Sequence, residues 1–256
     1  MSPFHGAFVW YELMTTDAAA AEPFYKSVVG WGAKDAGMPD MSYTLFNVGE
    51  IPVAGLMTCP ESVRQAGWRP GWIGHVAVDD VDASAAQAAK EGGVVHRAPQ
   101  DIPGVGRFAI IADPQGVIFS LFKGNGEPPA APAPGTPGHT GWRELHARDR
   151  EPAFAFYSKL FGWTKAEAHD MGPMGVYQIF AHKGEPIGGM LTKSEAVPAP
   201  FWLYYFNVES IEAAMARVKA GDGQILSGPH EVPGGSWIVQ CLDPQGAAFA
   251  LVAPRR

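Results

Sequence analysis

The chain has 256 residues, more than the roughly 100 to 150 of a usual single-core domain, so two domains are expected. Hydrophobic residues make up 46% of the sequence and charged residues only 18%, a balance that argues against disorder in anything but a short segment. A net charge of −7 with scattered Lys and Arg residues argues against a nucleic-acid partner.

The N-terminal part predicts a strand followed by a helix. Residues alternate in character from Phe8 to Met14, as in a strand with one buried face. Asp17 is expected to cap a helix over Ala18–Val29, and Gly30 is expected to end it. Three short strands should follow, at Ala33–Asp35, Tyr43–Val48 and Val53–Thr58.

The same order of elements is predicted a second time. A strand, a helix that Asp80 leads and Gly92–Gly93 stops, and three strands are expected at Ile73–Val78, Val81–Glu91, Val94–Arg97, Gly106–Ala112 and Val117–Phe122. The unit is therefore β-α-β-β-β.

The second half of the chain repeats the first. Trp10, Glu12, Leu13, Asp17, Phe24-Tyr25 and Gly30-Trp31 return 132 residues later as Trp142, Glu144, Leu145, Asp149, Phe156-Tyr157 and Gly162-Trp163. Trp72 and the segment Asp113-Pro114-Gln115-Gly116 return after 130 residues as Trp202 and Asp243-Pro244-Gln245-Gly246. Such self-similarity indicates a duplicated structural unit, so β-α-β-β-β is expected four times.

A linker is expected between the two halves. Residues 124–138 are rich in Pro, Gly and Ala and lack bulky apolar side chains, which is typical of a semi-stiff extended segment. The predicted domains are therefore residues 1–123 and 139–256.

These motifs resemble the vicinal oxygen chelate superfamily, which includes glyoxalase I, bleomycin-resistance proteins and extradiol dioxygenases. The resemblance is carried by W-x-E-L-x-x-x-D near each domain start, F-Y…G-W after the helix, V-D-D-V-D at 78–82 and D-P-Q-G before each last strand. More narrowly, the chain is similar to a tandem-domain subfamily that contains a mycobacterial culture-filtrate antigen and actinobacterial hydroxylases. The resemblance implies an α+β fold of tandem glyoxalase-like domains, each a cupped mixed β-sheet with helices outside.

The resemblance also implies where metal ligands should stand, and this sequence departs from the pattern. The positions on the first strand of each unit hold Trp10, Ile73, Trp142 and Leu203, and those on the last strands hold Ser120 and Ala250. A transition-metal site needs three or four converging N, O or S ligands. No cofactor is therefore expected, although a divalent metal held by Glu12, His75, Glu144 and His146 stays open as an alternative.

Strand parity selects the side chains that share the cup face with Trp10 and Trp142, because residues two apart lie on one face. Each cup gains a polar pair, Glu12 with His75 and Glu144 with Tyr205, and these four are the candidate catalytic residues. The candidate substrate-binding residues are Trp10, Met57, Arg107, Ser120, Trp142, His146 and Asn207, and further candidates for the same surface are Trp72, Met190 and Trp202. Alternatively, the Glu residues are structural and accept hydrogen bonds from a neighbouring strand or from a Trp, and the Trp side chains pack in the core.

Three functions remain open from the sequence. One is a metal-independent enzyme of hydroxylase or lyase type that acts on a small aromatic or carbonyl metabolite. The others are a non-catalytic protein that sequesters such a molecule or a drug, and a metal-dependent glyoxalase or dioxygenase. The expected partner is a small molecule, with no nucleic acid and no membrane, in a cytoplasmic monomer or weak homodimer, because neither a signal peptide nor a spanning apolar run is visible.

Overall fold

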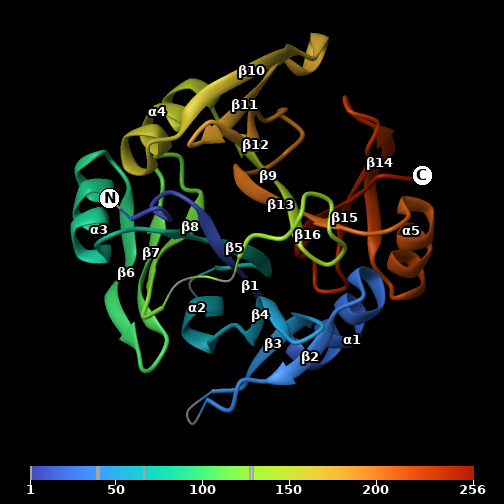
Figure 1. Ribbon diagram of the computed structural model, residues 1–256, viewed down its shortest axis with the longest axis horizontal. Coiled ribbons are helices and arrows are strands. Elements are labelled where there is room, and N and C mark those ends of the chain that lie inside the picture. Colours follow the sequence, from blue (N-terminus) through green and yellow to red (C-terminus); the bar gives the residue numbers. More distant parts are fainter. Residues whose placement is uncertain (1, 39–40, 66, 127, 129) are drawn as a thin grey trace. The chain divides into compact units, whose positions relative to one another are not determined.

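The computed structural model describes residues 2–38, 41–65, 67–126, 128 and 130–256 (Figure 1). Positions 127 and 129 of the predicted linker lie outside the described residues. The elements of the first repeat are β1 Phe8–Thr15, α1 Ala18–Val29, β2 Gly32–Asp35, β3 Tyr43–Val48, β4 Ile51–Thr58, α2 Glu61–Gln65, β5 Gly71–Ala77, α3 Val81–Lys90, β6 Val94–Ile102, β7 Gly106–Ala112 and β8 Ile118–Gly124.

The second repeat follows the same order without a counterpart of α2 among the described residues. Its elements are β9 Thr140–Ala147, α4 Arg150–Phe161, β10 Thr164–Asp170, the 3-10 turn η1 Gly172–Met174, β11 Val176–His182, β12 Glu185–Thr192, β13 Phe201–Asn207, α5 Ile211–Ala220, β14 Gln224–Glu231, β15 Trp237–Leu242 and β16 Ala248–Ala253. The fourfold β-α-β-β-β pattern predicted from the sequence is confirmed.

Each repeat supplies one mixed sheet of eight strands. The strand orders are β2-β3-β4-β1-β5-β8-β7-β6 and β10-β11-β12-β9-β13-β16-β15-β14. Parallel pairing joins β1 to β4, β5 to β8, β9 to β12 and β13 to β16, whereas the hairpins pair antiparallel. This is the α+β architecture of tandem glyoxalase-like domains that the sequence predicted.

Local sequence explains where the helices begin and end. The Asp17 side chain accepts a hydrogen bond from the backbone N–H of Ala20, and Asp149 does the same for Glu151, so each satisfies a donor that the first helical turn leaves unpaired. Gly30 and Gly162 end α1 and α4 in the left-handed conformation, at φ of 89° and 70°. The expected caps are therefore confirmed, and Asp149 serves as a cap.

The first compact unit consists of Met1–Val9, Ile73–Ala130 and Trp142–Trp202. Its helices α3 and α4 lie side by side, and Figure 1 shows both. In its core Phe119 packs edge-on against Tyr157 and Phe161. The Tyr157 hydroxyl donates to the buried Asp113 carboxylate at 3.1 Å and receives a hydrogen bond from the Trp202 indole at 3.1 Å.

The second compact unit consists of Trp10–Trp72, Ala131–Gly141 and Leu203–Arg256. Here α1 and α5 lie side by side (Figure 1), and Phe249 packs edge-on against Tyr25. The Tyr25 hydroxyl donates to Asp243 at 3.0 Å and accepts from Trp72 at 3.0 Å. Each compact unit thus draws elements from both sequence repeats, so the units and the repeats divide the chain differently.

Several other side chains are buried. Trp31 and Trp163 lie in the core. Cys59 and Cys241 are free and buried, and burial raises the pKa of Cys241 to about 12, so this thiol is inert at neutral pH. No helix in the described part of the chain has the length and apolar character needed to span a bilayer.

Candidate functional site

The first compact unit holds a cluster of four polar or aromatic side chains, the second-repeat cluster: Trp142, Glu144 and His146 on β9 and Tyr177 on β11. The Trp142 indole donates to the Tyr177 oxygen at 2.7 Å. The Tyr177 hydroxyl donates to Glu144 Oε2 at 2.9 Å. His146 Nε2 lies 2.7 Å from the other carboxylate oxygen, Oε1. Both oxygens of Glu144 therefore take part in hydrogen bonds.

The direction of these hydrogen bonds follows from the chemistry of the groups. An indole N–H can only donate, so the Tyr177 oxygen accepts from Trp142 and its own proton goes to Glu144. Burial, and next the charge of Glu144, raise the pKa of Tyr177 well above its usual value. The phenol therefore keeps its proton and acts as a permanent donor to the carboxylate.

His146 and Glu144 form a buried carboxylate–imidazole pair. Glu144 is 7% exposed and His146 is 9% exposed. The Phe201 ring stacks on the imidazole, with 4.7 Å between centroids and 12° between planes. A carboxylate that holds one ring nitrogen fixes the orientation of the imidazole, and the stacked ring restricts its rotation, so His146 is held in one orientation.

A glycine makes room for Tyr177. Gly189 on β12 is paired with Glu144 in the parallel ladder. A Cβ atom at this position would lie 2.2 Å from the Tyr177 hydroxyl oxygen and 2.1 Å from its ring carbon Cζ. Only a residue without a side chain allows the phenol to cross over β12 toward Glu144.

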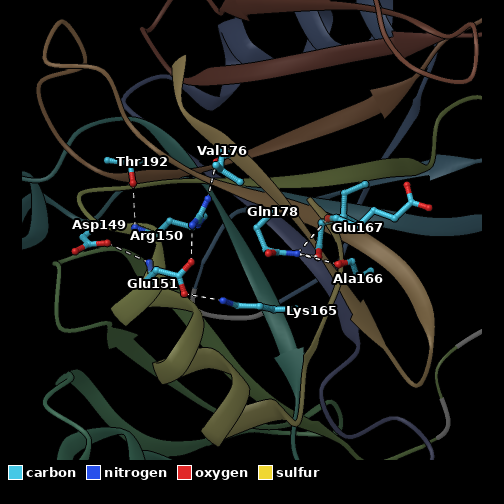
Figure 2. A network of polar contacts seen from close by, with 10 residues as sticks. Asp149, Arg150, Glu151, Lys165, Ala166, Glu167, Val176, Gln178 and Thr192 are labelled. Atoms are coloured by element: carbon cyan, nitrogen blue, oxygen red, sulfur yellow. Dashed lines mark hydrogen bonds and ion pairs between the residues drawn. The ribbon is translucent and has the colours of Figure 1, made fainter. Parts of the chain in front are cut away.

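The residues on either side of Tyr177 in β11, Val176 and Gln178, both take part in hydrogen bonds, which Figure 2 shows. Arg150 Nη1 donates to the carbonyl of Val176 at 3.0 Å. On the other side, the Gln178 amide donates to the carbonyls of Ala166 and Glu167, both at 3.1 Å, at a register shift in β10.

The N-terminus of α4 anchors the Arg150 side of this network. The backbone N–H of Arg150 donates to the Thr192 hydroxyl at 3.2 Å, and its guanidinium also bonds Glu151, which in turn pairs with Lys165 (Figure 2). This network connects α4, β10 and β11, and it holds the Tyr177 backbone in place.

The second compact unit holds a related arrangement, the first-repeat cluster: Trp10, Glu12 and Tyr43. Trp10 donates to the Tyr43 oxygen at 3.0 Å, and the Tyr43 hydroxyl donates to Glu12 Oε2 at 2.9 Å. Burial first, and then the charge of Glu12, raise the pKa of Tyr43 far above its usual value. Gly55 is paired with Glu12, and a Cβ there would lie 1.9 Å from the Tyr43 oxygen.

The two clusters differ in the group beside the carboxylate. Met14 stands at the position of His146, and Gly71 at the position of Phe201. The Trp–Tyr–Glu chain is thus shared by both repeats, whereas the imidazole and its stacking partner belong to the second repeat alone.

The strand parity predicted from the sequence is confirmed. Tyr11 and Leu13 are buried in the core, whereas Trp10 and Glu12 alternate with them and are only half-buried. The alternative that the Glu residues accept hydrogen bonds is confirmed, but the donors are Tyr43 and Tyr177, which stand one strand beyond the neighbouring β4 and β12, and each Trp acts through its Tyr. Catalytic roles for these carboxylates stay predictions.

His75 and Tyr205, the other two candidate catalytic residues, have different surroundings. His75 on β5 pairs with Ser120 on β8, and both are buried. Tyr205 on β13 accepts a hydrogen bond from the Gln240 amide at 3.0 Å. Glu12 and His75 belong to different compact units, as do Glu144 and Tyr205, so the predicted pairs stay predictions.

The remaining candidate binding residues lie at several places. Met57 pairs with Met14 and Tyr43 across the ladder, beside the first-repeat cluster. Asn207 is buried at the end of β13. Met190 is fully buried beside Leu145 in the ladder, and Trp72 and Trp202 are buried where they donate to core tyrosines. These three belong to the core, so their inclusion in the binding surface is corrected.

Arg107 lies at the surface and is held by two carboxylates. Its guanidinium bonds Asp82 at 2.6 Å and Asp101 at 2.9 Å. It also borders a hollow of about 200 Å³ together with Lys123 and Asn125. An anionic ligand at Arg107 would therefore have to compete with both aspartates.

Tyr43 and Tyr177 were missed from the sequence. They are 134 residues apart, whereas the aligned motifs before them are 132 apart, so the repeat alignment did not bring the two tyrosines together. The matching glycines, Gly55 and Gly189, are also 134 apart and are the signal that could have found them.

The described side chains do not supply the ligands of a transition-metal site. In the described ranges, no three His, Cys, Asp or Glu side chains converge in a way that could hold an ion. The second-repeat cluster offers one imidazole and one carboxylate; of its other members, the indole of Trp142 donates to the Tyr177 oxygen and the phenol of Tyr177 donates to Glu144. These residues do not fit the three- or four-ligand site that transition metals need.

Comparison with known proteins identifies a family for both repeats. The family model described as Glyoxalase/Bleomycin resistance protein/Dioxygenase superfamily matches residues 7–121 and 137–251. A Mycobacterium tuberculosis protein named "Putative glyoxylase CFP32" is 30% identical over 96% of this chain and 94% of its own length. The anthracycline biosynthesis protein DauV of a Streptomyces species (strain C5) is 31% identical over 98% of this chain and 94% of its own.

Solved structures share the fold at low identity. The 2,2',3-trihydroxybiphenyl 1,2-dioxygenase of Sphingomonas wittichii has a TM-score of 0.68 at 15% identity, covering 98% of this chain and 91% of that one. The Mn(II)-bound glyoxalase of Novosphingobium aromaticivorans has a TM-score of 0.63 at 18% identity, covering 96% and 81%.

Proposed function

We propose that this chain, which belongs to the Glyoxalase/Bleomycin resistance protein/Dioxygenase superfamily, acts on a small aromatic or carbonyl-bearing metabolite by acid–base chemistry at Glu144 and His146. The observation that carries the proposal is the buried pair itself, with Glu144 Oε1 2.7 Å from His146 Nε2 and Tyr177 on the opposite oxygen.

Each member of the second-repeat cluster takes a separate part. His146 accepts a proton from the substrate and returns it to another substrate atom, which is the proton movement of a lyase or isomerase. Glu144 holds the imidazole and offsets the positive charge that it gains. Tyr177 and Trp142 fix the carboxylate through a chain of donated hydrogen bonds, and the half-buried Trp142 ring offers a flat apolar surface to the substrate.

The relatives support the substrate class. One carries a name that points to carbonyl chemistry, and another is named for the biosynthesis of anthracyclines, which are flat aromatic compounds. Because the described donor set does not fit a transition metal, the proposed chemistry runs through the side chains and no step uses a metal.

The test is deuterium uptake from D₂O by aromatic ketones that carry a C–H next to the carbonyl, followed by NMR. Glu144→Gln should lower the rate about 100-fold or more, because the imidazole loses the charge that orients and stabilises it. Glu12→Gln is the matched control, since the first-repeat cluster has the same Trp–Tyr–Glu chain without an imidazole. Equal rates in the wild type and Glu144→Gln would refute the proposal.

A second candidate function is sequestration without turnover. It is favoured by the first-repeat cluster, in which Met14 replaces the imidazole while the half-buried Trp10 is retained. Sequestration predicts that every ketone that binds, as seen by quenching of Trp fluorescence, shows no deuterium uptake in any variant.

A further inference from the structure

One row of side chains in the first compact unit contains a buried polar group that the protein leaves unsatisfied. The ladders pair His75 on β5 with Ser120 on β8, Ser120 with Ile110 on β7, and Ile110 with Arg97 on β6. Directly paired residues point to the same side of a sheet, so these side chains form one row across four strands.

His75 is the unsatisfied member of this row. It is 6% exposed, and neither ring nitrogen has a hydrogen-bond partner among the described residues. The fully buried Ser120 hydroxyl donates to the carbonyl of Leu121 at 3.2 Å. Native proteins satisfy nearly all buried polar groups, because an unpaired one loses its hydration without compensation, so an exception calls for a partner from outside the chain.

In the corresponding row of the second repeat, the buried polar side chain has a hydrogen-bond partner. Tyr205, Ala250 and Gln240 stand at the positions of His75, Ser120 and Ile110. There the Gln240 amide reaches the Tyr205 hydroxyl at 3.0 Å. Ile110 has no polar atom to offer His75, so the first repeat lacks the internal partner that the second repeat has.

The surroundings of His75 define the chemistry of the missing partner. Phe122 presents its ring edge-on to the imidazole, with 6.0 Å between centroids, and Ile110 adds apolar surface in the same row. Burial lowers the pKa of His75 to about 4, so at neutral pH the ring is uncharged and offers one N–H donor and one acceptor nitrogen. Such a group suits an uncharged hydroxyl better than an anion.

We propose that His75 binds the hydroxyl group of an uncharged aromatic ligand on the β5–β8–β7 face of the first compact unit. The inference rests on the proposed function in taking the ligand to be a small aromatic molecule, but it does not depend on proton transfer at Glu144. His75 is thus a specificity-determining residue, which selects ligands that carry a hydroxyl.

The test compares 1-naphthol with naphthalene, which lacks only the hydroxyl. Binding is measured by fluorescence titration, and the ¹⁵N resonances of His75 are assigned by their loss in His75→Leu. Wild-type protein should prefer 1-naphthol about tenfold, the effect of one net hydrogen bond, and 1-naphthol alone should shift the His75 resonances. His75→Leu should bind both probes with equal affinity.

Two variants serve as controls. His96→Leu removes an exposed imidazole from β6 of the same compact unit, and it should keep the preference for 1-naphthol. Glu144→Gln should also keep it while losing turnover, so failure of the proposed function and failure of this inference give different results. Retained preference in His75→Leu, stronger binding of 1-naphthoate than of 1-naphthol, or no binding of 1-naphthol would each overturn the proposal.

Discussion

Asp113 lies buried where the turn between β7 and β8 meets the core of the first compact unit. Its Oδ1 accepts the backbone N–H groups of Gln115 and Val117, and its Oδ2 accepts the Tyr157 hydroxyl. Burial raises the pKa of Asp113, and the hydrogen bonds oppose that shift without cancelling it. The charged form is therefore disfavoured in the folded chain relative to the unfolded one.

This shift predicts how stability depends on pH. For a carboxyl group whose pKa is raised by folding, stability is highest below the ordinary pKa of 3.8 and falls as the pH rises toward the raised value, above which it is constant. Asp113→Asn keeps an acceptor for both backbone N–H groups but cannot ionise. Urea unfolding from pH 4 to pH 7 should therefore show a smaller loss of stability in the variant than in the wild type, and parallel curves would contradict the predicted shift.

At the scale of elements, the parallel pairing of β9 with β12 positions the second-repeat cluster. The ladder sets Glu144 opposite Gly189, and the open space over this glycine lets Tyr177 reach the carboxylate from β11. The hydrogen bond between Tyr177 and Glu144 thus depends on the positions of three strands, β9, β11 and β12.

Gly189→Ala should displace the Tyr177 ring and break its hydrogen bond to Glu144. We expect a loss of about 1 to 3 kcal/mol in unfolding free energy, the usual cost of overpacking a filled site, together with slower deuterium uptake. Gly32→Ala is the control, because the nearest atom to its added Cβ is 3.7 Å away. If both variants unfold at the same urea concentration as the wild type, the close approach of the Tyr177 ring to Gly189 does not affect the free energy of unfolding.

Elements with strong local signals could be predicted from the sequence, and those without them could not. Helix α1 and strands β3 and β7 have the predicted bounds, because caps, glycines and alternation mark their ends. Strand β6 was predicted as Val94–Arg97 but runs to Ile102, since its register shifts accommodate Pro99 within the strand. The five-residue helix α2 was missed because it has no apolar periodicity.

The candidate site was predictable only in part for a similar reason. Parity along a single strand placed Trp142, Glu144 and His146 on one face, because that rule needs only one segment. The contribution of Tyr177 depends on which strand pairs with β9 and in which register, and a single sequence does not contain that information.

At the scale of the whole molecule, the duplicated sequence explains why matching contacts occur twice and why the two repeats still differ. Tyr157 of the second repeat meets Asp113 of the first, and Tyr25 of the first meets Asp243 of the second. The sequence carries the same Tyr and Asp in each repeat, so it could not show which Tyr pairs with which Asp. The repeats share a structural frame of Trp, Tyr and Glu, and they differ in the groups that would contact a ligand or move a proton.

In the proposed function, side chains carry the chemistry of this family member, with His146 and Glu144 at its centre. The fold is shared with the Mn(II)-bound glyoxalase of Novosphingobium aromaticivorans, so the metal content of this chain must be measured.

The most direct test is to measure metal content by plasma mass spectrometry, together with deuterium uptake, on untagged protein before and after treatment with a chelator. We predict no stoichiometric transition metal and an unchanged rate after chelation. A stoichiometric metal whose removal abolishes uptake, and whose return restores it, would contradict the account.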